Sequence, residues 1–261
     1  MGCDFDLQTT MATSAVLQVA PHGDHHSTID AERWSGLGDH HRFLDEHANR
    51  CERFVVPPGP SRISYRAEVT VAGVPDPVSP DATEAPPEAL DDELLRWVLP
   101  SRFCHPDELG AVAWDRFGGV APGWGRVQAI CDHVHDSLDY VIGSSNPWTT
   151  ATDAYTAGQG VCRDYAHLAI TFCRALNIPA RYVFGYVPDT GEGPIDDPMD
   201  FAAWFEVHLS GRWHTFDARL RTPRTGRVVV GRGRDAVDVA MLTTFGPVEL
   251  MGFEVVADQL G

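Results

Sequence analysis

A cysteine at the predicted start of an apolar helix constrains this chain more than any other feature of its sequence. Cys162 follows Gly160, and apolar residues then recur at helical spacing until Asn177, just before Pro179. The first turn of a helix has unpaired backbone N–H groups and a partial positive charge, and both favour a thiolate. The sequence therefore predicts a nucleophilic thiol with a lowered pKa at the start of a helix over residues 162–177.

A strand hairpin that carries an aspartate follows this helix. Four strands are predicted, over residues 180–187, 203–209, 212–217 and 227–231. The turn Ser210-Gly211 joins the second strand to the third, which ends at Asp217. Because partners are counted outward from the turn, Asp217 is expected near residues 203–205, within reach of a side chain at position 202.

Three separated segments resemble the bacterial transglutaminase-like superfamily, whose fold is related to that of papain-type cysteine proteases. The segments are Gly158–His167, Ala175–Val183 with Gly185-Tyr186 behind it, and the hairpin from Asp200 to Ala218. The resemblance covers roughly residues 95–245. It implies that Cys162 is the nucleophile of a Cys-His-Asp triad and that Asp217 orients the base. Ala202 stands where members of the family carry the general-base histidine.

No nearby histidine is expected to replace that base. His208 lies on the same strand, but six residues at ~3.3 Å each place it ~20 Å from position 202. His214 falls beside the hairpin turn and is also remote. His167 points about 140° away from Cys162 around the helix. We therefore interpret these three as structural or surface histidines.

Four more residues are candidates for lining the site. Asp164 and Tyr165 directly follow the nucleophile, although Asp164 also reads as a helix-start charge worth ~0.3–1 kcal/mol. Trp204 is expected in the core with its ring near the site. Trp148 is a candidate side-chain donor to an oxyanion, together with the backbone N–H of Cys162. No cofactor or metal is predicted, since the spacing of His22, His25 and His26 matches no ligand set.

The remaining segments predict an α+β fold in which helices pack on an antiparallel sheet behind a small β-rich unit. Alternating polar and apolar residues predict strands over 5–20 and 61–73, with an irregular histidine-rich stretch over 22–47 between them. Helices are expected over residues 91–99 and 124–138, and a short one is capped near Thr152. The predicted domains are a β-rich domain over 1–75, a proline-rich linker over 76–90 and a transglutaminase-like core over 91–261.

The composition excludes several partners. The formal net charge is −17 and the sequence pI is about 4.9, which argues against nucleic acids and anionic membranes. All 20 basic residues are arginines, so the acyl acceptor must be another molecule, water or the N-terminus. The acidic start of the chain lacks signal-peptide character, and the six cysteines form no paired motif, so a cytoplasmic location is expected.

The resemblance implies a bacterial enzyme that attacks an amide, peptide or thioester carbonyl and forms an acyl-enzyme on Cys162. Water or an amine then accepts the acyl group, and the sequence does not choose between a peptidase and an amide-forming transferase. Because Cys162, Asp217 and their surroundings are intact, we interpret Ala202 as a His-to-Ala change that inactivates or cripples the site. The alternative is a natural pseudoenzyme that acts as a non-catalytic protein- or peptide-binding module. The acyl donor and acceptor and the oligomeric state stay open.

Overall fold

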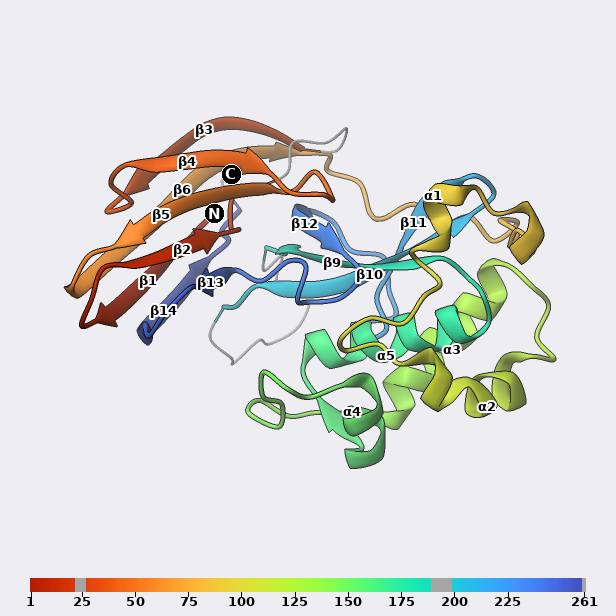
Figure 1. The fold of residues 1–261 in the computed structure, drawn as a ribbon. Helices are drawn as coiled ribbons and strands as arrows, with labels where there is room; N and C mark the ends of the chain where they lie inside the picture. Colours follow the sequence, from red (N-terminus) through yellow and green to blue (C-terminus); the bar gives the residue numbers. More distant parts are fainter. Residues whose placement is uncertain (22–26, 189–198, 260–261) are drawn as a thin grey trace.

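The computed structural model describes residues 1–21, 27–188 and 199–259 and has the predicted α+β fold. A four-stranded sheet lies between a group of helices and a second group of strands that contains both ends of the described chain (Figure 1). The helices of the described chain are η1 (Pro87–Ala89), α1 (Asp92–Leu95), α2 (Pro106–Phe117), α3 (Trp124–Ser137), α4 (Ala151–Ala157) and α5 (Cys162–Ala175). None of these helices has the length and apolar character needed to cross a membrane.

The central antiparallel sheet has the strand order β11-β10-β9-β12. Its strands are β9 (Ala180–Tyr186), β10 (Ala202–Leu209), β11 (Arg212–Phe216) and β12 (Val228–Gly233). Alternate residues of β10 face opposite sides, as strand geometry requires. Ala203 and Phe205 pack with α5 in the main core, whereas Trp204 packs with Val183 and Val229 on the other face. The predicted hairpin and its neighbours are therefore confirmed, with small shifts at the ends.

Helix α5 is buried from Asp164 to Arg174, and local interactions fix both of its ends. At its start the Asp164 carboxylate accepts a hydrogen bond from the Val161 N–H at 2.8 Å. A Cβ on Gly160 would lie 2.7 Å from the Asp164 Cβ, so glycine is required there. At its end Asn177 has a φ of 61°, a left-handed conformation that terminates helices. The helix thus begins at Cys162, as predicted, and stops two residues early.

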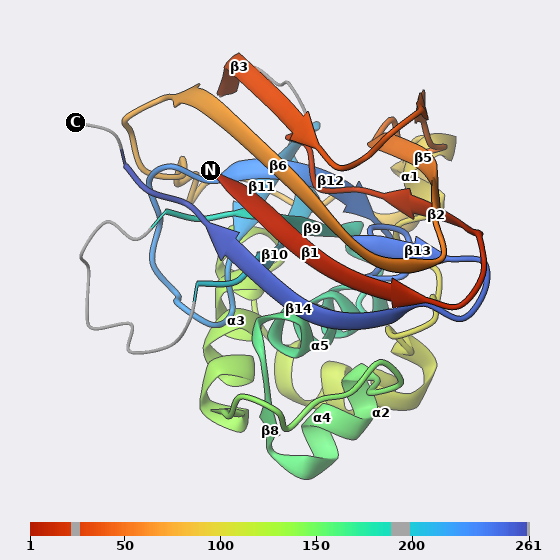
Figure 2. The same ribbon diagram turned by 90° about the vertical axis from the view of Figure 1, so that its left-hand side faces the viewer.

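The second group of strands forms two sheets, with the orders β14-β1-β6-β3 and β13-β2-β5-β4 (Figure 2). The strands are β1 (Gly2–Thr9), β2 (Thr13–Leu17), β3 (Ser27–Ser35), β4 (His40–Leu44), β5 (Arg50–Val56), β6 (Gly59–Val71), β13 (Leu242–Thr244) and β14 (Glu249–Val256). Gly2 pairs with Val256, so the last strands of the chain complete the N-terminal unit. A parallel pair, β7 (Asp139–Tyr140) with β8 (Gln159–Gly160), lies just before α5.

Several predictions for individual segments were wrong. Residues 5–20 contain two strands, β1 and β2, that belong to different sheets rather than one strand, and the stretch over 22–47 contains β3 and β4 rather than irregular chain. Thr150, not Thr152, caps α4, because its side chain accepts a hydrogen bond from the Asp153 N–H. Helix α2 was missed. Strands β3 and β4 are mostly exposed, so they have no alternating apolar pattern, whereas the buried residues of α2 do recur at helical spacing.

The N-terminal unit and the core share a hydrophobic cluster. Phe201, which directly precedes the site position 202, packs against Tyr186 at a ring distance of 4.8 Å and against Phe253 at 5.8 Å. The Tyr186 hydroxyl donates a hydrogen bond to the Val19 carbonyl at 3.1 Å. The N-terminal unit thus supports the strand that carries the site. The predicted domain boundaries at residues 75 and 90 stay predictions.

Substitution Phe201→Ala should lower the free energy of unfolding by about 3–5 kcal/mol, the usual cost of deleting a buried aromatic ring. Phe201 is 6% exposed, whereas Phe245 is 68% exposed, so Phe245→Ala is the matched control and should change stability by at most about 0.5 kcal/mol. Denaturant titration followed by tryptophan fluorescence measures both. Equal effects of the two substitutions would show that Phe201 does not join the two units.

Candidate functional site

The Cys162 sulfur lies against an open edge of β10. The His208 N–H donates to the Pro179 carbonyl on the β9 side, so backbone groups of odd-numbered residues point toward β11. Pairing with β11 stops at Phe205↔Phe216. Beyond that point the Cys162 Sγ lies 4.0 Å from the Phe201 carbonyl oxygen and near the Ala203 N–H, which favours its thiolate. The nucleophile candidate is therefore held directly beside position 202.

Burial raises the pKa of the Cys162 thiol to about 11. The Ala203 N–H and the Arg219 guanidinium act in the opposite direction, while the Asp200 and Asp217 carboxylates add to the rise. The predicted lowering of this pKa is wrong, because the loss of hydration on burial is the largest influence on it. Without a base the side chain is a thiol at neutral pH.

Asp217 forms the turn that ends β11. Its Oδ1 accepts hydrogen bonds from the backbone N–H of Arg219 at 2.9 Å and of Leu220 at 3.1 Å. Its Oδ2 accepts a hydrogen bond from the Arg227 guanidinium at 2.9 Å. Asp217 directly follows Phe216, the partner of Phe205, and the Arg227 that binds it also lies 4.8 Å from the Trp204 ring centre. The predicted proximity of Asp217 to residues 203–205 is confirmed.

Ala202 lies on the same face of β10 as Trp204 and Asp217, because positions 202 and 204 share a face and Ala202 packs with the Trp204 cluster. The Arg227 guanidinium lies 4.8 Å from the Trp204 ring centre. It also pairs with Asp76 at 2.8 Å. Sequence reasoning missed Arg227 and Asp76, since nothing in their spacing distinguishes them from the other charged residues. On the Trp204 side of the sheet, Arg227 thus joins Asp76 and Asp217 in a largely buried chain of charges.

The other candidate lining residues have separate positions. Asp164 is fully buried and holds the helix start, accepting a hydrogen bond from the Ser145 hydroxyl at 3.1 Å. The Tyr165 hydroxyl is bound to the Leu138 carbonyl, and burial raises its pKa. Trp148 is 71% exposed and lies beside Arg102. The role of Trp148 as an oxyanion donor stays a prediction.

The three histidines near the site are engaged elsewhere. His167 is fully buried, and its Nε2 accepts a hydrogen bond from the Ala236 N–H at 3.1 Å. His214 is buried beside the Leu209 carbonyl, and His208 stacks edge-on against Trp213. The structure therefore agrees that they do not replace the missing base. His22, His25 and His26 lie outside the described residues.

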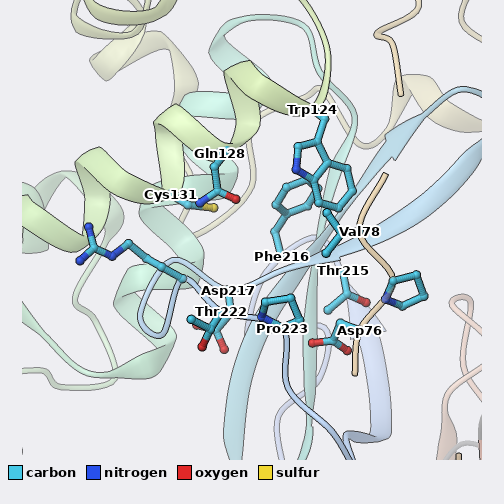
Figure 3. A pocket seen from close by; sticks show the side chains of 12 residues that line it. Asp76, Val78, Trp124, Gln128, Cys131, Thr215, Phe216, Asp217, Thr222 and Pro223 are labelled. Carbon is cyan, nitrogen blue, oxygen red and sulfur yellow. The ribbon is translucent and has the colours of Figure 1, made fainter. Parts of the chain in front are cut away.

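A cavity of about 190 Å³ lies beside Asp217 (Figure 3). Helix α3, the end of β11, the loop after it and the linker form its walls. Trp124, Phe216 and Val78 supply apolar surface, and the Asp76 and Asp217 carboxylates lie at one side. The cavity therefore offers an apolar group a binding space that ends at the site aspartate.

Arg219 and Tyr140 were also missed by the sequence analysis. Tyr140 pairs with Gly160, two residues before Cys162. The Arg219 Cζ lies 3.8 Å from the centre of the Tyr140 ring. Arg219 is two residues beyond Asp217, so the turn at Asp217 brings a cation to the cysteine side of the site.

Known proteins resemble this chain in sequence and in fold. A family model described as the transglutaminase-like superfamily matches residues 115–218. A crystal structure from Cytophaga hutchinsonii, provisionally described as a cysteine protease, superimposes with a TM-score of 0.85 at 30% identity, covering 97% of this chain and 87% of that one.

Uncharacterized mycobacterial proteins are also similar. The Mycobacterium leprae protein is 32% identical over 119 residues, which cover 44% of this chain and 42% of that protein. A Mycobacterium tuberculosis protein is 30% identical over 122 residues, which cover 39% of the length of that protein. The matched segment therefore spans less than half the length of these relatives.

Iodoacetamide should alkylate Cys162 before the other thiols. Cys162 is half-buried, whereas Cys3, Cys51, Cys104, Cys131 and Cys173 are buried. Because the thiol pKa is about 11, the rate should rise about tenfold per pH unit from pH 7 to 10 without a plateau. Peptide mass mapping at several pH values measures this, with Cys162→Ser as the control.

A plateau near pH 7 would show instead that the helix start stabilises the thiolate. Labelling of Cys104 or Cys131 before Cys162 would contradict the assignment of the nucleophile.

Proposed function

Because the chain belongs to the transglutaminase-like superfamily, which includes cysteine proteases and acyltransferases, we propose that Cys162 attacks an amide, peptide or thioester carbonyl to form an acyl-enzyme. The position of the sulfur carries this proposal. It lies at the start of α5 and at an open edge of β10, beside position 202, with Asp217 on the adjacent turn. No other cysteine is both partly exposed and at a helix start among the described residues.

The two half-reactions place different demands on the site. In acylation, a bond forms between Sγ and the carbonyl carbon, the bond to the leaving amine or thiol breaks, and the thiol proton goes to the leaving group. In deacylation, water or an amine attacks the thioester and must lose a proton to a base. Ala202 supplies no base, so the chain as written is crippled chiefly in deacylation and in acylation by poor leaving groups.

The acyl acceptor is proposed to be water or an amine of another molecule, because the chain has no lysine. The cavity beside Asp217 offers an amine-bearing group apolar walls and two carboxylates. All six cysteines are free, which suits a reducing cytoplasm. Hydrolysis and amide formation share the acylation step, so both belong to the proposal.

A natural pseudoenzyme that binds a protein or peptide is the second candidate. Two observations favour it. Arg227 already pairs with Asp217, the residue proposed to orient the histidine, and the pKa of Cys162 is raised to about 11. In this second case the cavity and the open strand edge would bind a ligand without chemistry.

Substitution Ala202→His should restore turnover. A positioned general base typically contributes ~10²- to 10⁴-fold, and the new imidazole would share a face with Asp217. The measurement is steady-state hydrolysis or amine transfer with aryl thioester and peptide amide substrates. Ala202→Gln is the matched control, since it adds bulk and hydrogen bonds without a base, and Cys162→Ala in the restored protein should abolish activity. A restored protein without turnover or acyl-enzyme would support the pseudoenzyme.

The chain as written should accumulate acyl-enzyme when given an activated thioester. A good leaving group allows acylation from the small thiolate fraction, whereas deacylation needs the missing base. Intact-mass spectrometry should find one acyl group on each unsubstituted chain and none on Cys162→Ser. With Ala202→His we expect release of product rather than a lasting adduct. Equal labelling of Cys162→Ser would place the modified residue elsewhere and overturn the scheme.

A further inference from the structure

We propose that Arg219 is a specificity-determining residue that binds a carboxylate of the acyl donor beside the carbonyl attacked by Cys162. This inference rests on the proposed function of Cys162. It narrows the acyl donor to an anionic peptide-like group, on a protein whose net charge of −17 would otherwise repel anions.

The backbone of Arg219 is held from both sides. Its N–H donates to the Asp217 carboxylate at 2.9 Å, and its carbonyl oxygen lies 2.7 Å from the His135 Nδ1. The position of the residue relative to the end of β11 is therefore fixed. The backbone at Arg219 therefore has little conformational freedom to lose on binding a ligand, which favours recognition.

The guanidinium of Arg219 stacks on Tyr140 with Cζ 3.8 Å from the ring centre. Stacking uses the flat face of the guanidinium and leaves the N–H groups at its edge available to donate. Within the described part of the chain, no carboxylate lies at ion-pair distance from Arg219. Arg227 and Arg163, the neighbouring arginines of the site, each pair with an aspartate. Arg219 is thus a half-buried cation whose guanidinium edge has no carboxylate partner among the described residues.

Two observations place this edge beside the nucleophile. The stacked Tyr140 pairs with Gly160 in the short parallel sheet that leads into Cys162. The ring of Tyr140 also lies 6.4 Å from that of Tyr165 on α5, and the Arg219 charge is near enough to influence both Cys162 and Tyr165. A carboxylate bound by Arg219 would therefore lie close to the carbonyl that the sulfur attacks. A guanidinium binds a carboxylate through two parallel hydrogen bonds, so orientation is recognised along with charge.

The chain next to Tyr140 adds an apolar surface. Val141 is 40% exposed and Ile142 is 60% exposed, and the Val141 N–H donates to the Gly160 carbonyl at 3.1 Å. This segment runs directly alongside the residues that precede Cys162. An acyl donor with an acidic side chain next to an aliphatic one would pair its carboxylate with Arg219 and pack its aliphatic group against Val141 and Ile142.

A pair of isosteric thioesters tests the inference. The donors are the aryl thioesters of acetyl-Leu-Glu-Gly and acetyl-Leu-Gln-Gly, which differ in one carboxylate. Rates of acyl-enzyme formation on the full chain are measured by intact-mass spectrometry. We expect the glutamate donor to react about 10- to 100-fold faster, the range for one hydrogen-bonded charge pair.

Arg219→Gln should reduce that ratio to about 1. Because the guanidinium also favours the Cys162 thiolate, both donors should slow by a common factor, and the ratio of the two rates is the readout. Arg219→Lys should retain part of the ratio, because it keeps the charge but not the planar fork. Arg96→Gln is the control, since Arg96 lies near the Trp97 ring at 6.0 Å and is exposed; it should change nothing. Melting temperatures verify folding.

The outcomes separate the two hypotheses. Equal rates for both donors, or a preference that survives Arg219→Gln, would overturn the role of Arg219 and leave the nucleophile intact. An equal loss with both donors in Arg219→Gln that leaves the ratio of their rates unchanged would show only a general effect on the thiol and also overturn the specificity role. Absence of Cys162 acylation by either donor would instead overturn the proposed function, and this inference with it.

Discussion

The hydrogen-bonded turn at Asp217 determines the geometry of the whole site. By accepting the N–H groups of Arg219 and Leu220, the carboxylate ends β11 and turns the chain away from β10. The departure of β11 opens the strand edge against which the Cys162 sulfur lies. The same turn directs Arg219 toward Tyr140. Loss of this carboxylate would therefore disturb the nucleophile, the cation and the cavity together.

Burial, not the helix end, controls the ionisation of the nucleophile in the chain as written. Each tenfold change in an ionisation equilibrium corresponds to about 1.4 kcal/mol, so a rise in the pKa from about 9 to about 11 opposes the thiolate by roughly 3 kcal/mol. A helix N-terminus supplies about 0.3–1 kcal/mol at an exposed site. A neighbouring imidazolium would add a full charge at short range. The helix start positions the sulfur, and a base is needed to ionise it.

The sequence predicted those parts of the fold that local signals encode. Helix α5 and the β10–β11 hairpin have clear periodicity, a glycine-containing turn and distinct ends, so their register could be counted in advance. The pairing of β14 with β1 could not be predicted, because it joins residues more than 240 positions apart. Strand β3 escaped notice because both of its faces are largely exposed.

For the site, the family pattern located Cys162, position 202 and Asp217, but not the groups that tune them. Arg219, Arg227 and Asp76 act through tertiary contacts. The sequence has 20 arginines, and no local pattern distinguishes Arg219 and Arg227 from the other arginines or Asp76 from the other acidic residues. The thiol pKa was mispredicted for the same reason, because burial of the sulfur depends on the packing of β10 against α5.

The structure also explains how Asp217 can persist without a histidine. A buried carboxylate that loses its partner normally destabilises a protein by several kcal/mol. Here Arg227 and two backbone N–H groups satisfy Asp217, so alanine at position 202 leaves no unpaired charge. Asp217 is needed for the turn whether or not the site is catalytic. The presence of Asp217 is therefore weaker support for a crippled enzyme than the sequence alone implied. The stronger support is Cys162, for which the described contacts show no comparable structural role.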